Sequence, residues 1–165
     1  MPVVSDASPI LGLSAIGLLE LLKAQFDSVF IPQAVLEELK VETNFRGTSA
    51  IQNALKNGWL QPRDVQNKPL AQAFALELDK GESEAIALAM DLGIQMIVMD
   101  ESTGRERARA MGLQTIGVLG ILLNAKKRGQ IKSVRTTMES LRQEVGFFIS
   151  ETLFEQIIQA SEESE

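Results

Sequence analysis

The first strand of this chain is the feature that most constrains its fold. Residues 3–6, Val-Val-Ser-Asp, are rich in β-branched side chains and end in an aspartate. A long apolar pattern of helical period begins at Pro9. Asp6 therefore stands at the carboxyl end of a predicted buried strand, directly before a helix. Ligands of open α/β sheets bind at that edge, although Asp6 or Ser8 could equally serve only as a helix N-cap.

Strand-like runs alternate with segments of helical period along the whole chain. Periodicity and turn signals predict strands at 3–6, 28–31, 59–62, 95–99 and 113–116. They predict helices at 9–24, 32–41, 48–56, 70–78, 82–93, 102–111, 118–128, 133–145 and 150–160. This alternation is typical of an α/β fold with a central parallel sheet and helices on both faces, which gives three layers. Pro62 predicts an edge position for the strand at 59–62.

The length of 165 residues predicts one domain. We expect this domain to cover residues 1–160, with a core at 1–128 and C-terminal helices at 133–160. The segment 161–165, Ser-Glu-Glu-Ser-Glu, is acidic, and we expect it to form a frayed tail.

Two predicted strands lead into aspartates, Asp6 at the end of 3–6 and Asp100 directly after 95–99. The carboxyl ends of parallel strands share one edge of a sheet, where ligands of such folds bind. Asp6 and Asp100 are therefore predicted to be neighbours in space.

The composition narrows the chemistry that this edge can carry. The chain contains no Cys and no His. This excludes disulfides, thiolate metal sites, histidine general bases and the usual zinc sites. Carboxylates, hydroxyls, Lys and Arg remain. A metal bound by oxygen ligands alone would be Mg²⁺ or Mn²⁺.

The net charge of −6 means that any surface for nucleic acid must be local. Arg105 and Arg109 share one face of the predicted helix at 102–111, where they could contact RNA phosphates or simply face solvent. The sequence has neither the pattern of a signal peptide nor an apolar run of 18 residues, so we expect a cytoplasmic protein without a membrane span.

Two predicted helices carry further acids. Glu38 lies closer to the apolar side of its helix than Glu37, which should face water. In the later helix, periodicity places Glu82 nearer the apolar side than Glu84. However, Asp79 and Glu82 have the spacing of a capping box, which explains Glu82 without any chemistry.

Four segments in a fixed order resemble a known family. They are Asp6 after an apolar strand, Pro32-x-x-Val35-x-x-Glu38-Leu39, Gly81-Glu82-x-Glu84-Ala85-Ile86-Ala87-x-Ala89, and Val98-Met99-Asp100-Glu101. Together they look like the PIN domain, the PilT N-terminus type of nuclease fold. The match is closest to small stand-alone prokaryotic members that are similar to the ribonuclease toxins of toxin–antitoxin pairs. The resemblance spans about residues 1–128, and the subgroup pattern extends to the C-terminal helices.

The resemblance implies a Mg²⁺- or Mn²⁺-dependent endoribonuclease. By position, its catalytic and metal-binding acids would be Asp6, Glu38, Glu84 and Asp100. Residues expected to support them are Ser8, Glu82 and Glu101. The family often has Asp at the position of Glu84, so the longer side chain changes the reach to metal. The resemblance also implies an RNA substrate, homodimers and an antitoxin partner.

Two other functions fit parts of the pattern. Phosphoryl-transfer domains also cluster aspartates at strand ends, but Asp6-Ala7-Ser8 lacks the second Asp that phosphatases with an aspartyl nucleophile use. A catalytically degenerate PIN fold could instead serve as a nucleic-acid-binding or interaction module.

Carboxylates held close together repel one another and raise at least one pKa, and divalent ions relieve this repulsion.

Overall fold

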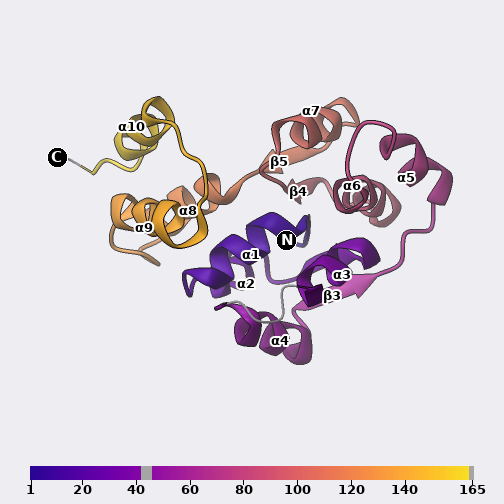
Figure 1. Cartoon of the computed structure of the whole chain (residues 1–165), viewed down its shortest axis with the longest axis horizontal. Coiled ribbons are helices and arrows are strands. Elements are labelled where there is room, and N and C mark those ends of the chain that lie inside the picture. Colours follow the sequence, from indigo (N-terminus) through magenta and orange to yellow (C-terminus); the bar gives the residue numbers. More distant parts are fainter. Residues whose placement is uncertain (42–45, 164–165) are drawn as a thin grey trace.

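The computed structural model describes residues 1–41 and 46–163 and is built around one parallel sheet. Its five strands lie in the order β3-β2-β1-β4-β5, and all four pairings are parallel. The strands are β1 (Val3–Ser5), β2 (Val29–Pro32), β3 (Leu60–Arg63), β4 (Met96–Val98) and β5 (Gln114–Ile116). Helices cover both faces of the sheet (Figure 1), which confirms the predicted three-layer α/β/α fold.

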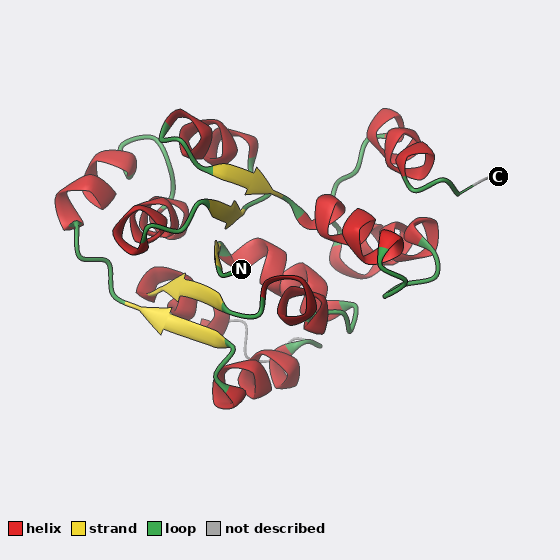
Figure 2. Cartoon of the chain, turned by 180° about the vertical axis from the view of Figure 1, so that it is seen from behind, coloured by secondary structure: helices red, strands yellow, loops and turns green. Residues whose placement is uncertain are grey.

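The described helices connect these strands and extend the chain at its C-terminal end. They are α1 (Ala7–Ala15), α2 (Glu20–Phe26), α3 (Gln33–Val41), α4 (Thr48–Asn57), α5 (Lys68–Phe74), α6 (Lys80–Leu92), α7 (Ser102–Ala110), α8 (Val118–Lys127), α9 (Val134–Ser140) and α10 (Glu151–Ala160). Figure 2 shows the strands between the helices, with the C-terminal helices grouped at one end of the molecule.

Neighbouring residues of the central strand enter two different cores. Val3 packs with apolar residues of α1, α3, α4 and α8, whereas Val4 packs with those of α5, α6 and α7. Both valines are fully buried. Successive side chains of a strand point to opposite faces of the sheet, so β1 anchors both helical layers.

Two expected helices are interrupted. The segment predicted as one helix at 9–24 forms α1 and α2, because Gly17 between them has a φ of 77°, which lies outside the helical region. The segment at 133–145 forms α9 and a π-helical turn over Leu141–Val145 that ends at Gly146. The strand with Pro62 lies at the sheet edge beside β2, as its proline predicted.

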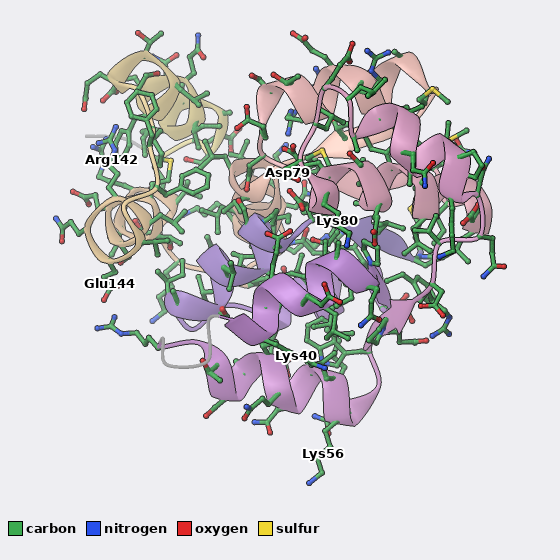
Figure 3. The ribbon with its side chains drawn as sticks, turned by 45° about the vertical axis from the view of Figure 1, so that its right-hand side comes forward. Lys40, Lys56, Asp79, Lys80, Arg142 and Glu144 are labelled. Carbon is green, nitrogen blue, oxygen red and sulfur yellow. The ribbon has the colours of Figure 1, made fainter. Side chains whose placement is uncertain are left out.

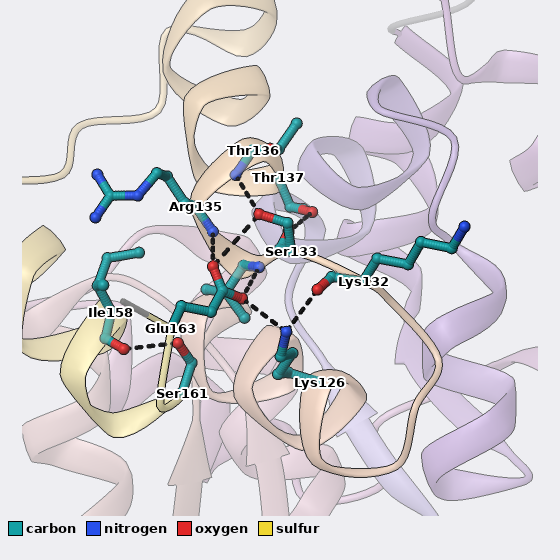
Figure 4. Close-up of polar contacts among 10 residues, drawn as sticks. Lys126, Lys132, Ser133, Arg135, Thr136, Thr137, Ile158, Ser161 and Glu163 are labelled. Atoms are coloured by element: carbon teal, nitrogen blue, oxygen red, sulfur yellow. Dashed lines mark hydrogen bonds and ion pairs between the residues drawn. The ribbon is translucent and has the colours of Figure 1, made fainter. Parts of the chain in front are cut away.

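The start of the expected frayed tail is held in place. The Glu163 carboxylate accepts hydrogen bonds from the amides of Val134 (2.5 Å) and Arg135 (3.1 Å). It also pairs with the Lys126 ammonium at 3.3 Å (Figure 4). Burial raises the pKa of Glu163, but the two amides and Lys126 outweigh it and hold the pKa below its usual value. Glu163 therefore ties the end of α10 to α8 and α9, whereas residues 164–165 of the expected tail lie outside the described residues.

We expect Glu163→Ala to lower the free energy of unfolding by about 1–2 kcal/mol at pH 7, because two partly buried amides lose their acceptor. The loss should shrink as the pH falls through the carboxyl range, since a group with a lowered pKa stabilises the fold only while it is ionised. Urea denaturation measures both effects. Glu155→Ala, on an exposed position of α10, is the matched control. Equal stability of the two variants would contradict this role of Glu163.

Candidate active site

Asp6 follows β1 at the carboxyl edge of the sheet. Its amide donates to the Val98 carbonyl of β4 (3.0 Å), which brings the ends of the two strands together. Asp6 holds the N-cap position of α1, but its side chain makes no capping hydrogen bond to that helix. The residue is only 7% exposed. Its burial is therefore not explained by a capping role.

The charge of Asp6 is costly in this environment. The pKa of Asp6 is raised from 3.8 to about 7, and burial is the largest cause of the rise. The Ala7 amide opposes it, whereas the nearby carboxylates of Asp79, Glu38 and Glu82 contribute to it. Three carboxylates, one from α3 and two from the start of α6, thus act on Asp6 at the same edge of the sheet.

Glu38 reaches this group from α3, past the first turn of α6. A Cβ atom at Gly81 would lie 2.1 Å from Glu38 Oε1 and 3.3 Å from Asp6 Oδ1. The absence of a side chain at Gly81 therefore leaves room for both carboxylates. Burial, followed by the charge of Asp79, raises the pKa of Glu38.

Glu82 combines a structural contact with a place among these acids. The predicted capping box is confirmed, because the Glu82 amide donates to Asp79 Oδ1 (2.8 Å) and the Asp79 amide donates to Glu82 Oε1 (3.2 Å). Glu82 is 5% exposed. Burial raises its pKa, as do the charges of Asp79 and Glu101. One oxygen of the Glu82 carboxylate therefore caps α6. The same carboxylate also belongs to the acidic group at this edge of the sheet, which consists of Asp6, Glu38, Asp79 and Glu82.

Glu84 lies on another side of α6. Its Oε1 accepts a hydrogen bond from the Ala34 amide at the start of α3 (3.0 Å). Together with Glu37 it lines a cavity between α3, α5 and α6. Glu84 is not among the charges that raise the pKa of Asp6. The structure thus brings Asp6, Glu38 and Glu82 together, and a metal-binding role for Glu84 stays a prediction from the resemblance.

Asp100 follows β4, the strand next to β1. Its Oδ1 accepts a hydrogen bond from the Val118 amide (2.9 Å). Its Oδ2 is buried and has no hydrogen-bond partner among the described residues. Burial raises the pKa of Asp100 overall, although the Val118 amide, Arg105 and the Ser8 hydroxyl each lower it. Val118 therefore fixes one oxygen of Asp100, and the other is buried without a hydrogen bond from the described residues.

Arg105 and Ser8 both act on Asp100. Arg105 donates to the Met99 carbonyl (3.0 Å), and a Cβ at Gly117 would meet both Asp100 Oδ1 (2.6 Å) and an Arg105 nitrogen (3.0 Å). The resemblance predicted that Ser8 supports the first-strand aspartate, yet its hydroxyl acts on Asp100. Burial lowers the pKa of Arg105, and the positive charge of the nearby Arg109 lowers it further.

Asp79 is the site residue that sequence reasoning missed. The sequence assigned it a capping role alone, but its charge raises the pKa values of Asp6, Glu38 and Glu82. Its exposed side chain stands at the start of α6 beside Lys80 (Figure 3). The signal available in the sequence was Asp-Lys-Gly-Glu at the start of a helix that already carried two candidate acids.

The donor set fits a hard divalent cation. Its atoms are carboxylate oxygens, which Mg²⁺ and Mn²⁺ prefer, and Asp100 Oδ2 is a buried oxygen that lacks a partner within the described residues. Residues 1–41 and 46–163 contain no group of three or more acids arranged closely enough to coordinate an ion. The acids therefore gather loosely at one edge, as expected for carboxylates that repel one another.

Comparison with known proteins agrees with the fold. A family model described as a PIN domain matches residues 2–163. The chain belongs to the PIN-domain family, whose members are generally nucleases. No curated protein matches the chain. Among the described helices, none has the length and apolar character needed to cross a membrane.

We expect Asp6→Asn to stabilise the metal-free protein, and to do so more at pH 8 than at pH 5. A raised carboxyl pKa means that the wild-type fold loses stability as the pH rises toward about 7, and Asn removes that loss. The gain at pH 8 should be about 1–3 kcal/mol in urea denaturation with EDTA. Asp64→Asn, at an exposed position, is the control. A gain of the same size at both pH values would show that Asp6 is not the group that titrates.

Proposed function

We propose that this protein is a Mg²⁺- or Mn²⁺-dependent endoribonuclease. The observation that carries the proposal is the convergence of Asp6, Glu38 and Glu82 at the sheet edge, beside the buried and partly unpartnered Asp100. Grouped carboxylates with raised pKa values are unfavourable for folding alone, and a bound cation relieves them. Membership of a family of nucleases supports phosphodiester hydrolysis, and the resemblance to ribonuclease toxins supports RNA as the substrate.

Each acid has a distinct part in this proposal. Asp6, Glu38, Glu82 and Asp100 would hold the metal, with Asp100 presenting Oδ2 because Val118 fixes its Oδ1. A bound ion would supply Lewis-acid activation of water and of the scissile phosphate. Arg105 favours the charged form of Asp100 and keeps a cation beside the place where an RNA phosphate would lie.

The choice between Glu82 and Glu84 differs from the family pattern. The resemblance points to Glu84, but its carboxylate is bonded to the Ala34 amide and lines the neighbouring cavity. Glu82 interacts electrostatically with Asp6 and keeps its capping bond through one oxygen. We therefore propose Glu82 as the fourth acid.

The resemblance to toxins supports a wider biological proposal. As the toxin of a toxin–antitoxin pair, the protein would act in the cytoplasm, form a homodimer and be inhibited by a small antitoxin protein. A small antitoxin-like reading frame next to its gene would support this role, and analytical ultracentrifugation would report the dimer. Metal binding without RNA cleavage would instead favour a degenerate PIN domain that acts as a binding module.

The central prediction concerns metal affinity. Asp6→Asn should weaken Mn²⁺ binding by about 100-fold or more, because it removes the buried anionic ligand on which the other acids converge. Isothermal titration calorimetry at pH 8, where wild-type Asp6 is ionised, measures this directly. Asp64→Asn should bind Mn²⁺ like the wild type. Unchanged Mn²⁺ affinity of Asp6→Asn would refute the proposed site.

The second prediction separates the two glutamates of α6. Glu38→Gln and Glu82→Gln should each reduce both Mn²⁺ affinity and the cleavage rate of a model RNA, the latter by about 100-fold, since amides are poorer ligands for hard cations. Glu106→Gln, at an exposed position of α7, is the matched control. Melting curves must accompany the assays because Glu82 also caps α6. If Glu82→Gln kept normal Mn²⁺ affinity and Glu84→Gln lost it, the fourth metal-binding acid would be Glu84 and not Glu82.

A further inference from the structure

A cavity of about 690 Å³ lies between α3, α5 and α6 and has no part in the proposed metal site. Apolar side chains that line it are Val65, Ala71, Ala75 and Leu78. Val65 and Leu78 are buried, so their contribution to the lining is fixed by packing. Polar groups that line it include Gln72, Ser83 and Glu84. This size, together with an apolar wall and a few polar groups, is typical of a site for a small organic ligand.

The first turns of α6 belong to both the cavity and the acidic group. Lys80, Ser83 and Glu84 line the cavity. Gly81, which lies between them in sequence, leaves room for the Glu38 and Asp6 carboxylates on its own side. Because the acids and the cavity share these turns of α6, a strand of RNA whose phosphate lies at the acids would pass beside the cavity. Single-stranded RNA is commonly recognised in this way, through bases that are splayed out of the stack.

Glu84 gives the cavity a defined hydrogen-bonding character. The Ala34 amide donates to its Oε1 at 3.0 Å, which orients the carboxylate in the cavity wall. The Ser83 hydroxyl is already committed, because it donates to the Asp79 carbonyl at 2.6 Å. An ionised carboxylate only accepts hydrogen bonds. The cavity therefore favours a ligand that presents N–H donors to Glu84.

Guanine is the base that matches this requirement. Its N1–H and N2–H donors lie side by side on the Watson–Crick edge, so that one carboxylate can accept both. Adenine and cytosine each place an acceptor next to their amino group, and uracil flanks its single N–H with two carbonyl oxygens. If these acceptors faced a carboxylate, they would be unpaired or repelled. An unpaired polar group in a binding site weakens binding strongly.

Charged residues around the cavity are compatible with a nucleotide. The exposed Lys68 and Lys80 line it and can pair with phosphates of the strand on either side of the base. They also offset the carboxylates of Glu37 and Asp64, which line the same cavity. Figure 3 shows Lys80 next to Asp79, at the start of α6.

We propose that this cavity binds a guanine base of the RNA substrate next to the scissile phosphate, with Glu84 as the residue that selects it. This inference rests on the proposed ribonuclease function and adds a sequence preference to it. It also gives Glu84 a role that does not involve the metal, in keeping with its absence from the charges that raise the pKa of Asp6.

The test begins with binding of mononucleotides to the full chain in EDTA, so that no metal can hold the phosphate. By calorimetry, guanosine 5′-monophosphate should bind about tenfold more tightly than uridine 5′-monophosphate, as expected for one or two additional hydrogen bonds. Glu84→Gln should abolish this difference, and Glu106→Gln should retain it. Ala71→Phe, which fills the cavity, should weaken binding of both nucleotides. Equal affinities in the wild type, or an unchanged preference in Glu84→Gln, would overturn the proposal.

Two further measurements separate this inference from the proposed function. Glu84→Gln should bind Mn²⁺ as the wild type does, and loss of that affinity would make Glu84 a metal ligand and overturn its selective role. Mapping of cleavage in a random RNA pool should show guanine enriched next to the cut, and Glu84→Gln should remove the enrichment.

The outcomes of the mapping are distinct. A wild-type protein that binds Mn²⁺ but cuts no RNA refutes the ribonuclease, and with it the substrate site. Cleavage without guanine enrichment refutes the base site alone, while the ribonuclease stands. Guanine-selective binding of the mononucleotide, combined with unselective cleavage, would make the cavity a site for a free nucleotide or another partner and overturn its assignment to RNA.

Discussion

Repulsion between carboxylates is the constraint on which the rest of this structure depends. The parallel pairing of β1 with β4 places Asp6 and Asp100 at one edge, where the Asp6 amide bonds to the Val98 carbonyl. α3 and α6 then bring two more acids to Asp6, whose pKa rises to about 7. The proposed cation would relieve this repulsion. The two buried cores on either side of β1 supply the stability that holds the acids together.

The position of Asp6 and Asp100 at the same edge of the sheet was predictable because it follows from topology alone. Parallel strands that each lead into an aspartate must bring those aspartates to the same edge, whatever the details of packing. The edge position of the strand with Pro62 was predictable for a similar reason, since proline cannot donate a ladder hydrogen bond. The family resemblance was a separate prediction, and the match over residues 2–163 confirms it.

Features that depend on side-chain direction could not be predicted in the same way. Helical periodicity leaned toward Glu82 rather than Glu84, but the capping box supplied a sufficient explanation for Glu82. In the structure one carboxylate does both, because a first-turn side chain can cap with one oxygen while its charge acts on the acids nearby. The hydrogen bond of Arg105 to the Met99 carbonyl and the break at Gly17 likewise depend on tertiary packing and backbone conformation.

Gly81 shows how stability and function can diverge at one backbone position. Alanine there would suit the first turn of α6 better, since glycine loses more conformational freedom on folding than any other residue. The new methyl group would meet the end of the flexible Glu38 side chain, which can turn aside without disturbing the fold. Selection for stability alone would therefore favour a side chain at position 81 and displace an acid from the site. A glycine in this turn is consistent with selection for what the acids do rather than for how firmly the chain folds.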